Sequence, residues 1–380
     1  MNKHDYKQNA YYLMYLIRCV LNDKIPAKEK LDKMDLSGVF AVAKAHSLTA
    51  IAAYALESAG IYDNAFEEEK NKAIRKEIIL DSEREKVLAE LENAGIWYMP
   101  LKGIIIKELY PQIGMRQMAD NDILFDKTRA SDIRSIMIHS GFKTELYDAG
   151  NQDVYYKPPI CNFEMHTELF PKSIENLFCE YYYGIKERLV KDMSKDYCYW
   201  FNTDDLYLFI VAHNYKHYSI SGTGLRSLVD TYVFLKKHGD NLNMQYIQNE
   251  CQKLGIATYE KQNRQLALNL LNGCKLTADE KCMFDYTVFS GTYGTVQNTV
   301  NNKLKKDRMR NLAKLKLIRN RVFVPFTRKN PRYKVYAARY KWFYKSKARI
   351  PLLFFYRIGT TLTCRRNRAK MEFEAILKAR

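Results

Sequence analysis

The chain has 380 residues, 47% hydrophobic and 27% charged, a composition that excludes a disordered tail and a length that suggests two or three domains. Residues 1–11 are polar, and no run of about 18 uncharged apolar residues could span a bilayer, so we expect a cytoplasmic protein without a transmembrane segment. The net charge of +18 arises entirely in residues 303–380, which carry +22, whereas residues 1–302 carry −4.

Helical periodicity dominates the first part of the chain. Apolar residues recur at helical spacing from residue 6 to about residue 95, which predicts an N-terminal helical region over residues 1–94. Gly95 ends the last of these helices, and the apolar run at 96–101 suits a buried strand. The change of period places a domain boundary near residue 95.

Strands and helices then alternate, which predicts a small α/β core over residues 95–185. The expected strands are 120–125, 154–156 and 162–169, and the expected helices are 104–110 and 131–140. Helical pattern returns over residues 186–300, with helices expected at 206–218, 225–238, 244–254 and 259–271. The predicted fold class is α+β: a small mixed-sheet core flanked by helical N-terminal and C-terminal regions.

Asp120 and Asp122 begin the expected strand 120–125. On a strand, residues i and i+2 point to one face, so the two carboxylates converge while Asn121 and Ile123 point to the other face. Two close carboxylates repel one another unless water or a cation neutralises them, and hard oxygen ligands suit Mg²⁺. Alone, an Asp-x-Asp sequence is more typical of a solvated turn, so the metal site depends on its surroundings.

Two neighbouring segments support a site for metal and phosphate. Upstream, Lys102 and Gly103 lie at a strand-to-helix turn, where glycine lets the backbone approach a phosphate and lysine adds positive charge. Downstream, Glu164, His166 and Glu168 alternate along an expected strand, so a third carboxylate can join the pair. Phosphoryl chemistry with two metal ions uses carboxylates in this way.

These motifs together resemble an uncharacterised nucleotidyltransferase family of the polymerase-β-like superfamily. The resemblance is carried by Leu101-Lys102-Gly103, Leu109-Tyr110-Pro111, Gly114, Arg116, Asp120-Asn121-Asp122-Ile123-Leu124 and Glu164-Met165-His166. It extends to the helical residues 41–56, His213, His217, Gly224-Leu225-Arg226, Asp230 and a C-terminal region marked by arginine and proline.

The resemblance implies an enzyme that transfers a nucleoside monophosphate from an NTP to an acceptor hydroxyl or phosphate and releases pyrophosphate. It implies that Asp120 and Asp122 bind two Mg²⁺ ions and that Glu164 is the third active-site carboxylate. It also implies that Gly103 lies under the triphosphate, with Arg116 near it. The acceptor, whether a small molecule, a protein or an RNA end, is not identified by the sequence, and neither is the base of the NTP.

Several of these residues have simpler structural interpretations. Lys102 could pair with a surface acid, and Arg116 could form a salt bridge with Asp126 or Glu108. His166, beside Glu164, could orient a carboxylate or donate to a phosphate of the nucleotide, with a satisfied structural histidine as the alternative. Arg226 and Asp230, at i and i+4, are expected to form an intrahelical ion pair.

His213 and His217 lie at i and i+4 on one helical face. This spacing can bind zinc, but residues 214–216 lack the glutamate of a metalloprotease motif. We expect this helix to face the cleft and to offer His213, Lys216 or His217 to the nucleotide or the acceptor, with core packing as the alternative.

The basic C-terminal region, residues 301–380, interleaves cations with aromatic rings, as at 332–345. This chemistry binds single-stranded nucleic acid, although a helix with rings packed inward and charges solvated has the same composition. The apolar stretch 350–358, flanked by Arg349 and Arg357, suits attachment to an anionic membrane. Proline residues in this region predict that long helices are absent except near the last residues.

A second functional hypothesis concerns the turn at Lys102-Gly103-Ile104. It replaces the Gly-Ser that is usual in the superfamily, so no serine hydroxyl is present to hold a terminal phosphate. The alternative to an enzyme is therefore a nucleotide- or nucleic-acid-binding module with little turnover that uses the basic C-terminal arm.

Overall fold

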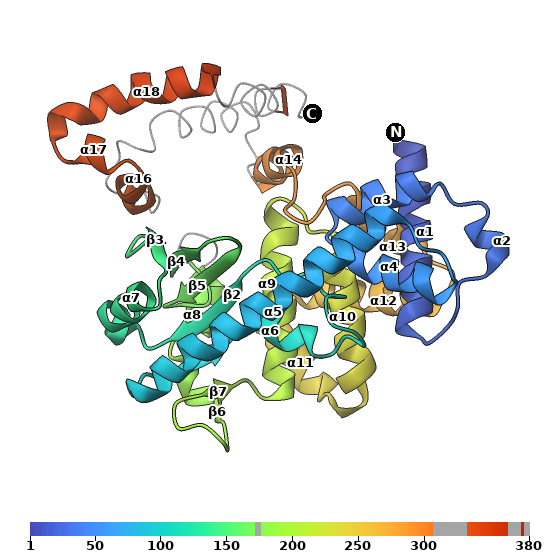
Figure 1. The fold of residues 1–380 in the computed structure, drawn as a ribbon, viewed down its shortest axis with the longest axis horizontal. Helices are drawn as coiled ribbons and strands as arrows, with labels where there is room; N and C mark the ends of the chain where they lie inside the picture. The colour runs from blue at the N-terminus through green and yellow to red at the C-terminus, as the bar shows by residue number, and fades with distance from the viewer. Residues whose placement is uncertain (172–175, 307–332, 364–373, 376–380) are drawn as a thin grey trace.

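The computed structural model describes residues 1–171, 176–306, 333–363 and 374–375 (Figure 1). It confirms the α+β class, because helices flank a mixed sheet of five strands. The sheet lies to one side of the described body, and the long helix α5 (Asn64–Asn93) runs from the N-terminal helices across it (Figure 1).

Helices α1 to α5 precede the sheet, as the sequence predicts. They are α1 (Lys3–Leu21), α2 (Lys28–Leu31), α3 (Leu36–Ala45), α4 (Thr49–Ser58) and α5. Polar side chains begin the longest two: the Asn2 side chain accepts a hydrogen bond from the N–H of Asp5, and the Asp63 side chain accepts from the N–H of Ala65, both at 2.9 Å. Gly95 follows α5 with a φ of +64°, a conformation that glycine adopts without strain.

The strands of the sheet lie in the order β1-β2-β5-β4-β3. They are β1 (Tyr98–Pro100), β2 (Asn121–Phe125), β3 (Lys143–Leu146), β4 (Gln152–Lys157) and β5 (Cys161–His166). Strands β2 and β5 run parallel in the centre, and the other neighbouring pairs are antiparallel. Strand β3 was not predicted, and β5 ends at His166 rather than at residue 169, so Glu168 lies outside it.

Alternate side chains of β2 enter two different cores. Ile123 packs in a buried cluster with Leu80 of α5 and Ile133 of α7 (Ala130–His139). Leu124 packs in a second cluster, which joins the sheet to the helices before and after it. The side of β2 that carries Asp122 and Leu124 is therefore turned away from α5.

The helices after the sheet begin at residue 176. They are α8 (Asn176–Tyr181), α9 (Thr203–Ile220), α10 (Leu225–His238), α11 (Met244–Lys253), α12 (Ala257–Asn272), α13 (Ala278–Val288) and α14 (Val296–Lys306), and a small hairpin of β6 (Val190–Lys191) and β7 (Tyr199–Trp200) separates α8 from α9. One buried cluster contains residues of α1, α4, α9, α10 and α12, so the N-terminal helices and these later helices share a core.

The described part of the C-terminal region consists of helices. These are α16 (Tyr333–Arg339), α17 (Lys341–Tyr344), the 3-10 turn η5 (Lys347–Arg349) and α18 (Ile350–Thr363). Helix α18 has 14 residues, longer than expected beside Pro351, because a proline in the first helical turn removes no internal hydrogen bond. None of the helices in the described ranges is long and apolar enough to cross a membrane.

Candidate active site and metal cluster

Asp122 lies on the central strand β2 and faces away from α5. Its neighbour Asn121 points to the opposite face, where the side-chain amide donates to the carbonyl of Leu80 at 2.9 Å and accepts from Arg84 at 3.2 Å. Because alternate residues of a strand face opposite sides, this anchoring of Asn121 to α5 directs the Asp122 carboxylate to the other face. The polar residue between the two aspartates thus has a structural function.

Three side chains meet where β2 and β5 run parallel. Asp122 is the register partner of Glu164, and His166 follows two residues later on the same face of β5. One ligand atom from each of Asp122, Glu164 and His166 lies within 4.8 Å of the others. The His166 Nε2 atom is 2.9 Å from Asp122 Oδ1 and 3.8 Å from Glu164 Oε2. We call these three residues the acid cluster.

Asp120 borders the acid cluster and is not one of its three members. It precedes β2, which begins at Asn121, and it is half-buried. Burial and then the charge of Asp122 raise the pKa of Asp120, and the charge of Asp120 in turn contributes to a raised pKa at Glu164. Asp120 and Asp122 are therefore close enough to affect each other's ionisation, although only Asp122 belongs to the acid cluster.

Glu164 is the carboxyl group of the acid cluster whose ionisation is disfavoured. Burial, followed by the charges of Asp122 and Asp120, raises the pKa of Glu164 to about 7. Burial also opposes ionisation of Asp122, but Lys102 and His166 outweigh it and lower the pKa of Asp122. A cation relieves repulsion of this kind. The donor set of two carboxylates and one imidazole fits a divalent metal ion.

Lys102 and residues of helix α9 lie beside the acid cluster. Lys102 Nζ lies 3.6 Å from Asp122 Oδ2 and 2.9 Å from His213 Nε2. His213 Nε2 is also 3.3 Å from Nε2 of His217, which is exposed. Burial and the nearby charge of Lys102 lower the pKa of Lys216 to about 8, against the opposing effect of Asp122 and Glu164. The structure thus brings α9 to the cluster.

Arg116 lies in a buried ion pair. Its Nε and Nη2 atoms each donate a 2.9 Å hydrogen bond to the carboxylate of Asp230 on α10, and Tyr110 donates to the same carboxylate at 2.7 Å. Arg116 is 8% exposed and Asp230 is 7% exposed. The suggested partners Asp126 and Glu108 were therefore wrong. The Arg116–Asp230 ion pair connects the loop before β2 to α10.

The intrahelical pair expected between Arg226 and Asp230 is replaced by contacts to the loop before β2. Arg116 pairs with the Asp230 carboxylate, and Arg226 Nη1 donates to the carbonyl of Gln117 at 2.9 Å. The charges of Lys102, Arg226 and Lys76 oppose the rise in the pKa of Asp120. Lys76 of α5 was not among the predicted residues, because no local motif marks it.

Gly103 packs against Arg116. A Cβ atom at residue 103 would lie 3.2 Å from Arg116 Nη1 and 3.3 Å from Met118 Cε, closer than a methyl group normally approaches. Arg116 Nη1 also donates to the carbonyl of Gly103 at 3.4 Å. The glycine therefore lets the Arg116 guanidinium support the turn that carries Lys102.

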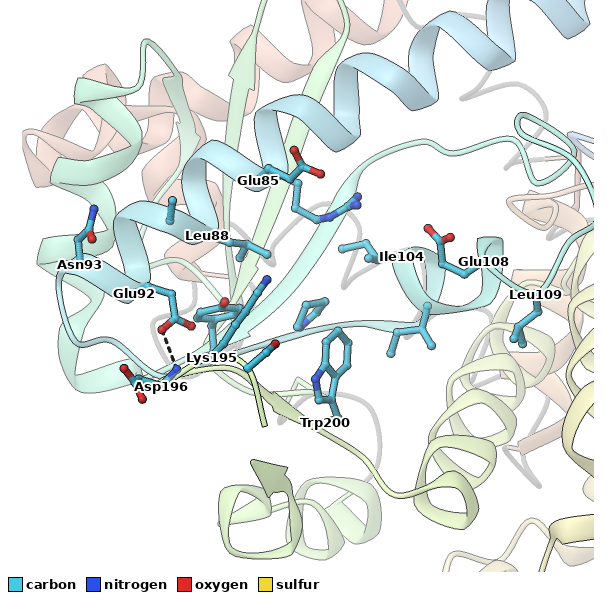
Figure 2. Close-up of a pocket in the computed structure, with 16 residues that line it drawn as sticks. Glu85, Leu88, Glu92, Asn93, Ile104, Glu108, Leu109, Lys195, Asp196 and Trp200 are labelled. Atoms are coloured by element: carbon cyan, nitrogen blue, oxygen red, sulfur yellow. Dashed lines mark hydrogen bonds between the residues drawn. The ribbon is translucent and has the colours of Figure 1, made fainter. Parts of the chain in front are cut away.

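A cavity of about 730 Å³ lies beside α5, α6 (Lys102–Lys107) and β7 (Figure 2). Its lining includes Leu88, Tyr98 and Ile104, which belong to the buried cluster on the α5 side of the sheet. Asp122 faces the other side, and the cavity lining includes none of the predicted site residues. Glu168, which follows β5, is not one of the three residues of the acid cluster, and its carboxylate lies 4.0 Å from Lys127.

The structure thus places a possible metal-ligand group, the acid cluster, on the two central strands of a small mixed sheet, and comparison with protein families indicates the class of protein. The model of a family described as uncharacterised nucleotidyltransferase matches residues 32–272, a segment that contains the sheet, the acid cluster, α9 and α10. The chain belongs to this nucleotidyltransferase family, as its motifs suggested. No curated protein and no solved structure matches the chain.

Proposed function

We propose that this protein is a Mg²⁺-dependent nucleotidyltransferase that moves a nucleoside monophosphate from an NTP to an acceptor hydroxyl or phosphate, with release of pyrophosphate. The family supports nucleotidyl transfer and an NTP substrate. The observation that carries the finer proposal is the convergence of Asp122, Glu164 and His166 within 4.8 Å beside Lys102.

Asp122, Glu164 and Asp120 are the residues that would hold two Mg²⁺ ions. The lowered pKa of Asp122 keeps this carboxylate ionised at neutral pH, as a metal ligand must be. His166 contacts Asp122 through Nε2 and so fixes the orientation of the carboxylate. Bound Mg²⁺ would polarise the phosphate oxygens and neutralise the charge that develops during transfer.

The nucleotide would lie between the acid cluster and α9. Lys102 contacts His213, and Lys216 is near enough for the charge of Lys102 to lower its pKa. These three residues would present positive charge or hydrogen-bond donors to the triphosphate. His217, exposed at the rim, is a further candidate for nucleotide or acceptor contact. Gly103 and Arg116 support this binding site through the Lys102 turn, which Arg116 contacts directly.

Label transfer tests the proposal. Each NTP, labelled at the α-phosphate, is incubated with Mg²⁺ and the protein, with and without cell lysate as a source of acceptor. The wild type should label an acceptor, and Asp122→Asn should reduce the rate by more than about 100-fold. Asp126→Asn is the matched control, because Asp126 directly follows the strand that carries Asp122. Its side chain accepts a hydrogen bond from the N–H of Thr128 and caps the next turn, and asparagine caps equally well.

Two outcomes separate the hypotheses. Label transfer by Asp122→Asn at the wild-type rate would show that Asp122 is not part of the active site. Binding of an NTP without label transfer in any lysate would favour the binding module that the absent serine suggested.

A further inference from the structure

Helix α18 exposes an apolar face. Leu352, Phe355 and Tyr356 are 49%, 67% and 50% exposed, and their spacing places them on one side of an α-helix. Leu353 points to the other side, where it is completely buried. The helix is therefore held by the side that carries Leu353, and Leu352 and Phe355 present an aliphatic and an aromatic side chain to solvent on another side. In Figure 1, α18 lies at the outer edge of the molecule, and α16 lies against β3.

The segment that carries this apolar face is positively charged. Residues 333–363 contain seven Lys and Arg and no Asp or Glu. Lys341 and Lys347, in the adjoining α17 and η5, are exposed. Trp342 is 54% exposed, and the Arg349 guanidinium lies over its ring at 4.7 Å. Apolar residues bordered by tryptophan and cations are characteristic of helices that lie in the interface of an anionic membrane.

The aromatic rings of this segment favour a membrane over nucleic acid. Binding of bases requires ring faces that are open to stacking. The rings that alternate with cations in the sequence pack on one another instead: Tyr333 on Tyr344 and Phe343 on Tyr356, with both pairs of centroids 5.2 Å apart. The most exposed apolar side chain of the segment, Phe355, belongs to α18, outside this alternation, as does the aliphatic Leu352. The exposed ring of Trp342 carries the Arg349 guanidinium over one face.

We propose that α16, α17 and α18 attach the protein to the surface of an anionic lipid bilayer. Helix α18 lies in the plane of the interface, with Leu352 and Phe355 inserted among the acyl chains and the lysines of α17 and η5 at the phosphates. The attachment is peripheral, since no described helix can span a bilayer. It is independent of the proposed transferase reaction, because none of the acid-cluster residues belongs to this segment.

Vesicle sedimentation with the full-length chain tests this attachment. Vesicles of phosphatidylcholine alone are compared with vesicles in which one third of the lipid is phosphatidylserine. The wild type should bind the anionic vesicles, and its affinity should fall as salt is added. The double variant Leu352→Glu/Phe355→Glu should weaken binding by at least about tenfold, because both side chains lose their insertion into the apolar layer.

The control is the double variant Tyr62→Glu/Tyr293→Glu, which places two acids at residues 72% and 79% exposed outside the segment. It adds the same charge and should leave binding unchanged within about twofold. Since Leu352 and Phe355 are exposed, their replacement leaves the core intact, and equal melting temperatures of the two double variants would verify this.

Equal binding by all three proteins, or no preference for anionic vesicles, would overturn the proposal. Displacement of the protein from vesicles by single-stranded RNA at lower concentration than lipid would assign the surface to nucleic acid instead.

Discussion

Replacement of Glu164 by glutamine tests the electrostatic description of the acid cluster through protein stability. Burial and the two aspartates raise the pKa of Glu164 from 4.5 to about 7. The ionised form is thus less favourable in the folded protein than in the unfolded chain. The free energy of unfolding therefore decreases as the pH rises from 4.5 through about 7, and it stays lower above that pH.

The size of this change in the free energy of unfolding follows from the shift in the pKa of Glu164. A rise from 4.5 to about 7 corresponds to about 3 kcal/mol at full ionisation. The Glu164 side chain is 30% exposed, so solvent screening reduces the expected gain on removing its charge to about 1–2 kcal/mol. Without metal, Glu164→Gln should be more stable than the wild type by this amount near pH 8, and by only a small fraction of it near pH 4.

Urea unfolding in the presence of a chelator measures this difference at the two pH values. Glu168→Gln, which removes a carboxylate that follows β5 and lies near Lys127, is the control and should show no comparable gain at the higher pH. Addition of Mg²⁺ should then stabilise the wild type more than Glu164→Gln, because a ligand stabilises the state that binds it. A Glu164→Gln variant that is less stable than the wild type at both pH values without metal would refute this reasoning.

Three further predictions concern neighbouring contacts. Arg116→Met should lower the free energy of unfolding by about 3–5 kcal/mol in urea titrations, because it leaves the Asp230 carboxylate buried without its cation; a loss below about 1 kcal/mol would show that the pair is not buried in solution. Mg²⁺ or Mn²⁺ should raise the melting temperature of the wild type and leave that of Asp122→Asn unchanged, and an equal rise in both would place the metal elsewhere. His166→Gln should weaken Mn²⁺ binding about tenfold or more in calorimetric titrations, whereas an unchanged affinity would show that metal binding does not depend on the contact of His166 with Asp122.

Features set by local periodicity could be predicted from the sequence. Helix α10 begins and ends at the predicted residues, and α9, α11 and α12 differ from their predicted bounds by a few residues. Strand β3 could not be predicted, because its sequence Lys-Thr-Glu-Leu has no apolar alternation. It lies at the edge of the sheet, where charged side chains face water.

Part of the acid cluster could also be predicted, because it depends on the alternation of side chains along a strand. Strand alternation places Glu164 and His166 on one face of β5, and the parallel register then sets Asp122 opposite Glu164. The partner of Arg116 could not be inferred in this way. Asp230 lies 114 residues further along the chain, and its contact with Arg116 depends on how α10 packs against the loop before β2.

The position of the transferred label tests the central claim most directly. The wild type and Asp122→Asn are incubated in parallel with an NTP labelled at the α-phosphate and with the same NTP labelled at the γ-phosphate, each with Mg²⁺ and lysate. We predict that the α-label enters the acceptor and the γ-label appears in pyrophosphate, and that Asp122→Asn loses both products. Appearance of the γ-label in the acceptor, or transfer of the α-label that is unaffected by Asp122→Asn, would contradict a nucleotidyltransferase built on this aspartate.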